Sequence, residues 1–198
     1  THAYSVDIHT LKVLQSAMND PLYHSLSDVD KTALKYAVLL HDLGKKGGVV
    51  DEGHANLSSD YTRDILKNMQ LSDTLKDRIV NIVDNHHWFA AYNTGGVDAF
   101  SVAAGCRRRG QFNIYQILAK ADLENVNDNF HLRVTGTRNQ KEFDKYFVAK
   151  MQPIEEQRQL INMRSSLVYP DRITRNGDLF DKVQTVRGDK TYNVPVLN

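Results

Sequence analysis

The stretch Leu39 to Lys46, LLHDLGKK, places a histidine and an aspartate side by side at the end of a predicted apolar helix. Carboxylates are disfavoured at this end of a helix, because the helix dipole is negative there. Asp42 therefore needs a positively charged partner close by. Together with His41 it offers the oxygen and nitrogen donors that divalent metal ions accept.

Four more side chains of these two kinds lie three or four residues from apolar residues of other predicted helices: His9, His54, His86 and Asp122. That spacing places each of them on the apolar face of its helix. A polar group buried there without a partner costs on the order of 2 to 7 kcal/mol. A single histidine of this kind is usually a hydrogen-bonded core residue, but the whole set favours convergence around a divalent cation in a helical core.

The elements that must position these residues are helices, and the sequence predicts an all-α fold. Helices are expected over residues 4–18, from a cap at Asp28 or Asp30 to near Gly44, over 57–69, from Ser72 or Asp73 through 86, over 97–106, and over 111–126. A long amphipathic helix is expected over 141–165, with Pro153 as a kink or break. The tail, VQTVRGDKTYNV, fits either a small hairpin or an extended arm.

Composition sets the broad class. The chain has 198 residues, 41% hydrophobic and 25% charged, enough for one compact domain. We expect a metal-binding helical domain at 1–135 and a C-terminal extension at 136–198 packed on it. The net charge of +1 gives no general indication of nucleic acid or an anionic membrane as partner.

No apolar run is long enough for a membrane span, and no signal peptide is recognisable. Cys106 is the single cysteine, so no internal disulfide can form, and we expect a reducing, cytoplasmic location. The chain begins at Thr1 without methionine, and we expect it to be a piece of a longer protein.

Five ordered segments, HAYSVDIHTLKVL, AVLLHDLGKK, EGHANLSSDYTRDIL, IVNIVDNHHW and ILAKADLENV, resemble the motifs of the HD-domain superfamily of metal-dependent phosphohydrolases. The similarity spans roughly residues 2–130, and the HD domains of uridylyl-removing and tRNA CCA-adding enzymes look most alike. The resemblance implies a compact multi-helix bundle. It also implies one metal held by His9, His41, Asp42 and Asp122, and a second held by His54 and His86, with Asp42 bridging.

Two divalent ions can clamp the attacking and leaving oxygens of a displacement at phosphorus. Lys45, and more weakly Lys46 and Arg107, are candidates to bind phosphate oxygens, although loop and helix-end charges are often only solvated. His87 is a candidate for substrate contact or for protonating the leaving group. The donor set suits manganese, iron, cobalt, nickel or zinc better than magnesium, and one or two ions fit it.

The expected reaction is hydrolysis of a phosphomonoester or phosphodiester of a nucleotide or a nucleotidylated substrate. Within this superfamily, the subgroup that hydrolyses cyclic-di-guanylate carries a Gly-Tyr-Pro signature after its paired histidines. That subgroup is disfavoured here, because NHHWFAAYNTGG lacks the signature. We expect Trp88 and its aromatic neighbours to pack rather than to stack a base. Three alternatives stay open: a di-iron oxygenase, a noncatalytic regulatory domain that senses nucleotide or metal, and a structural module whose histidines pair with carboxylates.

Overall fold

A computed structural model of the chain describes residues 5–45, 53–108, 111–126, 130–168, 182–187 and 190–195. The elements in these residues are α1 (Val6–Asn19), α2 (Pro21–Ser25), α3 (Asp28–Leu40), α4 (His54–Lys67), α5 (Asp73–Asp84), α6 (Trp88–Asn93), α7 (Ala99–Arg108), α8 (Phe112–Glu124), α9 (Phe130–Thr135), α10 (Gln140–Val168), β1 (Lys182–Arg187) and β2 (Lys190–Pro195). The helical bundle confirms the predicted all-α class.

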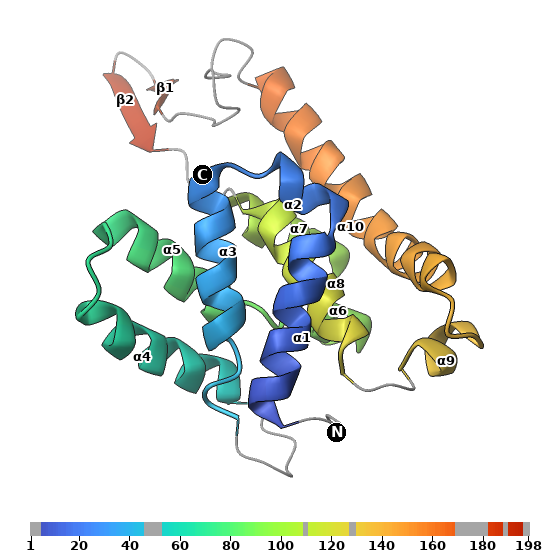
Figure 1. Cartoon of the computed structure of the whole chain (residues 1–198). Helices are drawn as coiled ribbons and strands as arrows, with labels where there is room; N and C mark the ends of the chain where they lie inside the picture. The colour runs from blue at the N-terminus through green and yellow to red at the C-terminus, as the bar shows by residue number, and fades with distance from the viewer. Residues whose placement is uncertain are drawn as a thin grey trace.

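The centre of the bundle is formed by α1, α3 and α8, which pack against one another (Figure 1). Each helix contributes fully buried apolar side chains at helical spacing, such as Val13 from α1, Leu34 and Val38 from α3, and Leu118 from α8. Burying a side chain of this size contributes about 1.5 to 3 kcal/mol. The polar residues on the same helix faces are therefore held in place by the surrounding core.

The pair α4 and α5 forms one flank of the bundle, where α5 packs on α3 and α4 packs on α5 (Figure 1). Ile79 and Ile82 of α5 are fully buried in this packing. This packing brings the first residues of α4 and the residues after α5 toward the C-terminal end of α3.

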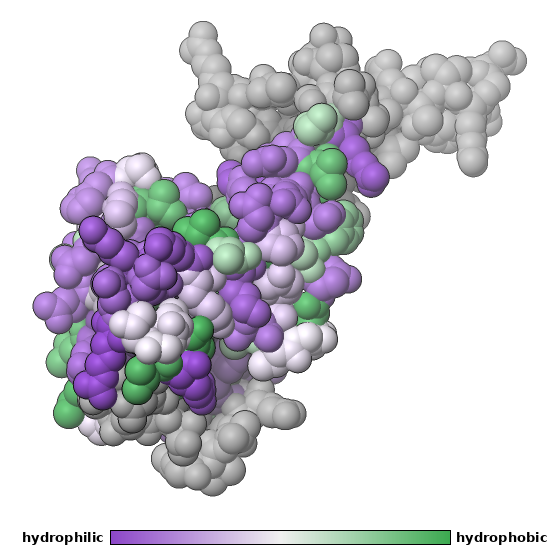
Figure 2. Space-filling model, turned by 90° about the vertical axis from the view of Figure 1, so that its right-hand side faces the viewer, coloured by the Kyte–Doolittle hydropathy of each residue, from purple (hydrophilic) through white to green (hydrophobic). Residues whose placement is uncertain are grey.

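The long helix α10 packs on α7, and its Phe147, Met151 and Ile154 belong to the same hydrophobic core as α1, α3 and α8. Pro153 lies inside α10 and does not end it, so the predicted break is wrong. Figure 2 shows the side of the molecule that includes α10, where hydrophobic residues are scattered among polar ones.

Among the described residues after α10, two strands pair antiparallel, with Lys182 opposite Pro195 and Arg187 opposite Lys190. They correspond to the hairpin form of the predicted tail. The Gly-Asp pair expected at its turn lies outside the described residues.

Several predicted helix boundaries are wrong. Ser27, rather than Asp28 or Asp30, caps α3, because its hydroxyl accepts a hydrogen bond from the Asp30 amide. α5 ends at Asp84, so His86 lies in a turn instead of on a helix face. The short helices α2, α6 and α9 were not predicted, because five or six residues show no reliable periodicity.

In the described part of the chain, no helix is both long enough and apolar enough to span a membrane.

Candidate metal centre

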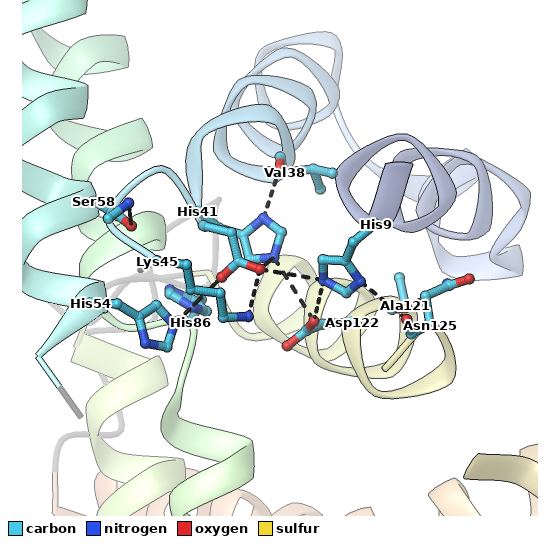
Figure 3. Close-up of polar contacts among 12 residues, drawn as sticks. His9, Val38, His41, Lys45, His54, Ser58, His86, Ala121, Asp122 and Asn125 are labelled. Carbon is cyan, nitrogen blue, oxygen red and sulfur yellow. Dashed lines mark hydrogen bonds and ion pairs between the residues drawn. The ribbon is translucent and has the colours of Figure 1, made fainter. Parts of the chain in front are cut away.

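Side chains from five separate parts of the chain meet near the C-terminal end of α3. His9 comes from α1, His41 and Asp42 from the end of α3, and Asp122 from the last turn of α8. His54 is the first residue of α4, and His86 follows α5. Figure 3 shows the labelled side chains of His9, His41 and Asp122 turned toward one another. All six predicted metal ligands therefore lie in one cluster, as expected.

Asp42 lies at the centre of this cluster, with its side chain 1% exposed. Its Oδ2 atom is 3.4 Å from the Nε2 atoms of both His9 and His41. The Oδ1 atom of Asp122 completes this first group, 3.0 Å from His9 Nε2 and 3.8 Å from His41 Nε2. The first group thus combines two imidazoles and two carboxylates.

The other oxygen of Asp42 faces a second group of histidines. Its Oδ1 atom is 3.4 Å from His54 Nε2 and 3.9 Å from His86 Nε2. His87 Nε2 lies 2.7 Å from His54 Nε2, and the three histidines of this group each offer a nitrogen within 4.8 Å of the others. One carboxylate therefore presents a different oxygen to each group, which is the arrangement of a bridging ligand.

Three imidazoles are oriented by hydrogen bonds to backbone carbonyls. The Nδ1 atoms lie 3.1 Å (His9), 2.7 Å (His41) and 2.6 Å (His86) from the carbonyl oxygens of Asn125, Val38 and Val83, respectively. A carbonyl oxygen only accepts, so each Nδ1 must donate its proton. These bonds aim the Nε2 atoms at the carboxylates, as is usual for histidines that bind a metal.

Gly44 lets the turn after α3 approach α4. A Cβ atom at this position would lie 2.6 Å from the His54 carbonyl oxygen and 2.8 Å from the Ser58 amide nitrogen. The Gly44 amide also donates a buried hydrogen bond of 2.9 Å to the Ser58 hydroxyl. Any side chain here would separate Asp42 from His54, so the glycine of HDLGKK has a definite steric role.

The electrostatics of the cluster keep the carboxylates ionised. Burial by itself would raise the pKa of Asp42, but the hydrogen bond with His54 and the charges of His41 and Lys45 outweigh it, so its pKa lies well below the ordinary range. Burial likewise opposes charge on Asp122, and hydrogen bonds with His41 and His9 hold its pKa low.

The histidines differ among themselves. Burial, followed by the charges of His41 and His87, holds the pKa of His86 well below its ordinary value. Burial and the charge of His54 lower the pKa of His87 to about 4. For His41, burial is outweighed by the hydrogen bond and charge of the neighbouring carboxylates, which raise its pKa. Metal ions bind ionised carboxylates and neutral imidazoles, so the low pKa values of His86 and His87 favour metal binding, whereas the raised pKa of His41 opposes it.

The residues of the cluster fit divalent cations. Donors about 2.1 Å from one ion lie about 3.0 Å apart at a right angle and about 3.4 Å apart at the tetrahedral angle. Most of the spacings around Asp42 fall near these values. Within the described part of the chain, His41 Nε2 and Asp42 Oδ1 are also buried without a hydrogen bond of good geometry. Such groups require a partner, and a cation between them would supply it.

Lys45 lies beside the first group. Its Nζ atom is 2.6 Å from Asp42 Oδ2, and its side chain is 19% exposed, so it is placed between the buried cluster and solvent. Lys46 and the side chain of Arg107, the other predicted phosphate contacts, lie outside the described residues.

The aromatic residues after His87 pack in or against the hydrophobic core, as predicted. Phe89 is buried, and the Trp88 ring stacks on Tyr115 with the ring centroids 5.7 Å apart. Trp88 also covers Gly105 so closely that a Cβ atom there would clash with the indole ring. Among the residues that the structure describes, these contacts support packing of the aromatic rings rather than stacking on a base.

Two features of the site go beyond the prediction. His87 was predicted as a substrate contact or proton donor, and the structure groups it with His54 and His86 among residues that could hold a metal. The role of Asn125, whose carbonyl oxygen accepts a hydrogen bond from His9, was not predicted, because a backbone acceptor has no sequence signature. The only signal was its place in the segment ILAKADLENV, three residues after Asp122.

A family model for the HD domain matches residues 6–122, which include all six residues of the cluster and more than half of the chain. No curated protein matches the sequence.

Proposed function

The chain belongs to the HD-domain family, and from this premise we propose that it is a metal-dependent phosphohydrolase. The proposed reaction adds water to a phosphomonoester or phosphodiester of a nucleotide or nucleotidylated substrate, so that one P–O bond forms and another breaks. The main support is Asp42, whose two oxygens face two separate groups of side chains that could hold a metal ion. A carboxylate that only paired with one histidine would not need this arrangement.

Two sets of residues would hold the metal ions. His9, His41 and Asp122 would bind the first ion with Asp42 Oδ2, and His54 and His86 would bind the second with Asp42 Oδ1. Bound in these places, divalent ions would activate water and neutralise charge on the phosphoryl group. Because the donors are imidazoles and carboxylates without thiolates, manganese, iron, cobalt, nickel and zinc suit them better than magnesium.

The protein's own residues would bind and orient the substrate. Lys45, at the boundary between cluster and solvent, is positioned to donate to a nonbridging phosphate oxygen. His87 remains neutral near pH 7, since its pKa is about 4. A neutral imidazole has one donor and one acceptor, so His87 is suited to hydrogen-bond the phosphoryl group or the leaving oxygen.

The test is release of phosphate or nucleotide from a panel of nucleoside mono-, di- and triphosphates, cyclic nucleotides and a nucleotidylated protein, with and without Mn²⁺. Native protein is compared with Asp42→Asn and with the control Asp60→Asn, whose carboxylate is 68% exposed on α4. We expect metal-dependent turnover in the native and control proteins and none in Asp42→Asn. Equal turnover in Asp42→Asn would contradict the proposal.

Two other outcomes would replace the proposed function. Tight nucleotide binding by the metal-loaded protein without turnover would indicate a regulatory domain. Retained iron together with oxygen consumption would indicate an oxygenase, because the same nitrogen and oxygen donors also suit iron.

A further inference from the structure

Asn125 occupies the C-cap position of α8, three residues after Asp122, and contacts α1 as well as its own helix. Its backbone N–H donates to the Asp122 carbonyl oxygen at 3.1 Å. Its own carbonyl oxygen accepts the Nδ1–H of His9 at 3.1 Å, a contact that Figure 3 includes. Asn125 is thus bonded both to the helix turn of one proposed ligand and to the ring of another.

The side-chain amide of Asn125 adds two bonds. Its Nδ2 donates to the Ala121 carbonyl oxygen at 2.8 Å and to the Ser16 hydroxyl at 2.9 Å. The first satisfies a carbonyl at the end of α8 that would otherwise lack a helical partner. The second crosses to α1, two turns beyond His9. Both amide hydrogens are therefore used, one on each helix.

We propose that Asn125, together with Ser16, is a positioning unit that holds the His9 imidazole and the Asp122 carboxylate in register across the α1–α8 interface. This inference rests on the proposed function only for its consequence, which is metal affinity. The positioning itself follows from hydrogen bonds that can be examined without metal.

A comparison among the histidines shows why His9 needs such a unit. His41 and His86 bond to carbonyl oxygens three residues earlier in their own chain segments. The acceptor for His9 is 116 residues away and belongs to another element. Its position depends on how α1 and α8 are joined, and the Asn125 amide joins them beside the site.

The magnitude of the effect follows from this difference. Loss of a partner that orients a metal-binding histidine typically lowers metal affinity 10- to 100-fold. Asn125→Ala keeps the backbone carbonyl and the backbone N–H bond to Asp122, but it removes the side-chain bonds to Ser16 on α1 and to the Ala121 carbonyl of α8. Ser16→Ala removes only the bond across the interface, so its effect should be smaller and its fold intact, since Ser16 is on the partly exposed side of α1.

The first test is solvent exchange of the histidine Nδ1 protons, measured by NMR on the metal-free protein. We expect exchange at His9 to accelerate at least about tenfold in Asn125→Ala and less in Ser16→Ala, while exchange at His41 and His86 is unchanged. Ser16→Thr keeps the hydroxyl, so the His9 Nδ1 proton should exchange at the native rate in this variant. Ser165→Ala, on α10, is the matched control.

Two results would overturn the proposal: an unchanged exchange rate at His9 in Asn125→Ala, or parallel acceleration at all three histidines, which would indicate general destabilisation. The second test is Mn²⁺ binding, where Asn125→Ala should raise the dissociation constant about 10- to 100-fold. Failure of the native protein to hydrolyse any substrate would refute the proposed function and leave the exchange result standing, so the two hypotheses fail separately.

Discussion

Replacement of Gly44 by alanine tests whether the close contact between the turn after α3 and the start of α4 builds the site. The added Cβ would lie 2.6 Å from the His54 carbonyl oxygen, against about 3.4 Å for an ordinary contact. The backbone segments must therefore separate by about 0.8 Å or more. This movement draws Asp42 away from His54, whose present separation of 3.4 Å matches that of two ligands at the tetrahedral angle.

The stability cost can be estimated from the same geometry. Both close neighbours are backbone atoms, which cannot rotate away, and overpacking of this kind costs about 1 to 3 kcal/mol. For a chain of this length the expected fall in Tm is about 2 to 12 °C. We also expect fewer Mn²⁺ ions bound per chain, because the second group depends on His54. Differential scanning calorimetry and a Mn²⁺ titration measure the two effects.

Gly96→Ala provides the matched control. A Cβ there would first meet the Ala91 carbonyl oxygen at 3.4 Å, an ordinary contact, so Tm and metal binding should stay near native values. If Gly44→Ala matched Gly96→Ala in both measurements, the inferred role of Gly44 would be wrong.

Two further predictions concern Lys45 and His87. Lys45→Met should lower kcat/KM about 10- to 100-fold, which is the effect of losing one charge-assisted hydrogen bond. Mn²⁺ affinity should stay equal or rise, because the ammonium group no longer occupies Asp42 Oδ2. Steady-state kinetics and Mn²⁺ titration measure the two effects, and a fall in metal affinity would contradict the prediction. Burial lowers the pKa of His87 from 6.5 to about 4, so on acidification the unfolded chain is protonated at His87 before the folded protein is. The stability contributed by neutral His87 is therefore present above pH 6.5 and lost as the pH falls toward 4. Urea unfolding of metal-free native and His87→Asn proteins between pH 7 and 4.5 should show a shallower loss in the variant, and equal slopes would disprove the assignment.

The sequence was sufficient to group the six proposed ligands because burial constrains them strongly. His9 and Asp122 lie among apolar residues of regular helices, where a polar group must find a partner, so periodicity alone predicted that both face the bundle. His9 is buried, and the side chain of Asp122 is 28% exposed. His41 and Asp42 were recognisable because a carboxylate at the end of a helix is unfavourable.

The exact positions of His54 and His86 could not be predicted in the same way. Both were expected on helix faces, but His54 begins α4 and His86 lies in a turn. Their places depend on contacts between distant segments, such as the approach of Gly44 to Ser58, and on backbone hydrogen bonds. The positioning role of Asn125 belongs to the same class, since it arises from a contact between helices more than a hundred residues apart in sequence.

The most direct measurement of the central claim is anomalous diffraction at the manganese edge from crystals of the protein loaded with Mn²⁺. We expect a peak bounded by Asp42 Oδ2, His9, His41 and Asp122, and, at higher Mn²⁺ concentration, a second peak bounded by Asp42 Oδ1, His54 and His86. Manganese bound elsewhere, with the Asp42 carboxylate still paired only to Lys45 and the histidines, would contradict a metal centre at this site.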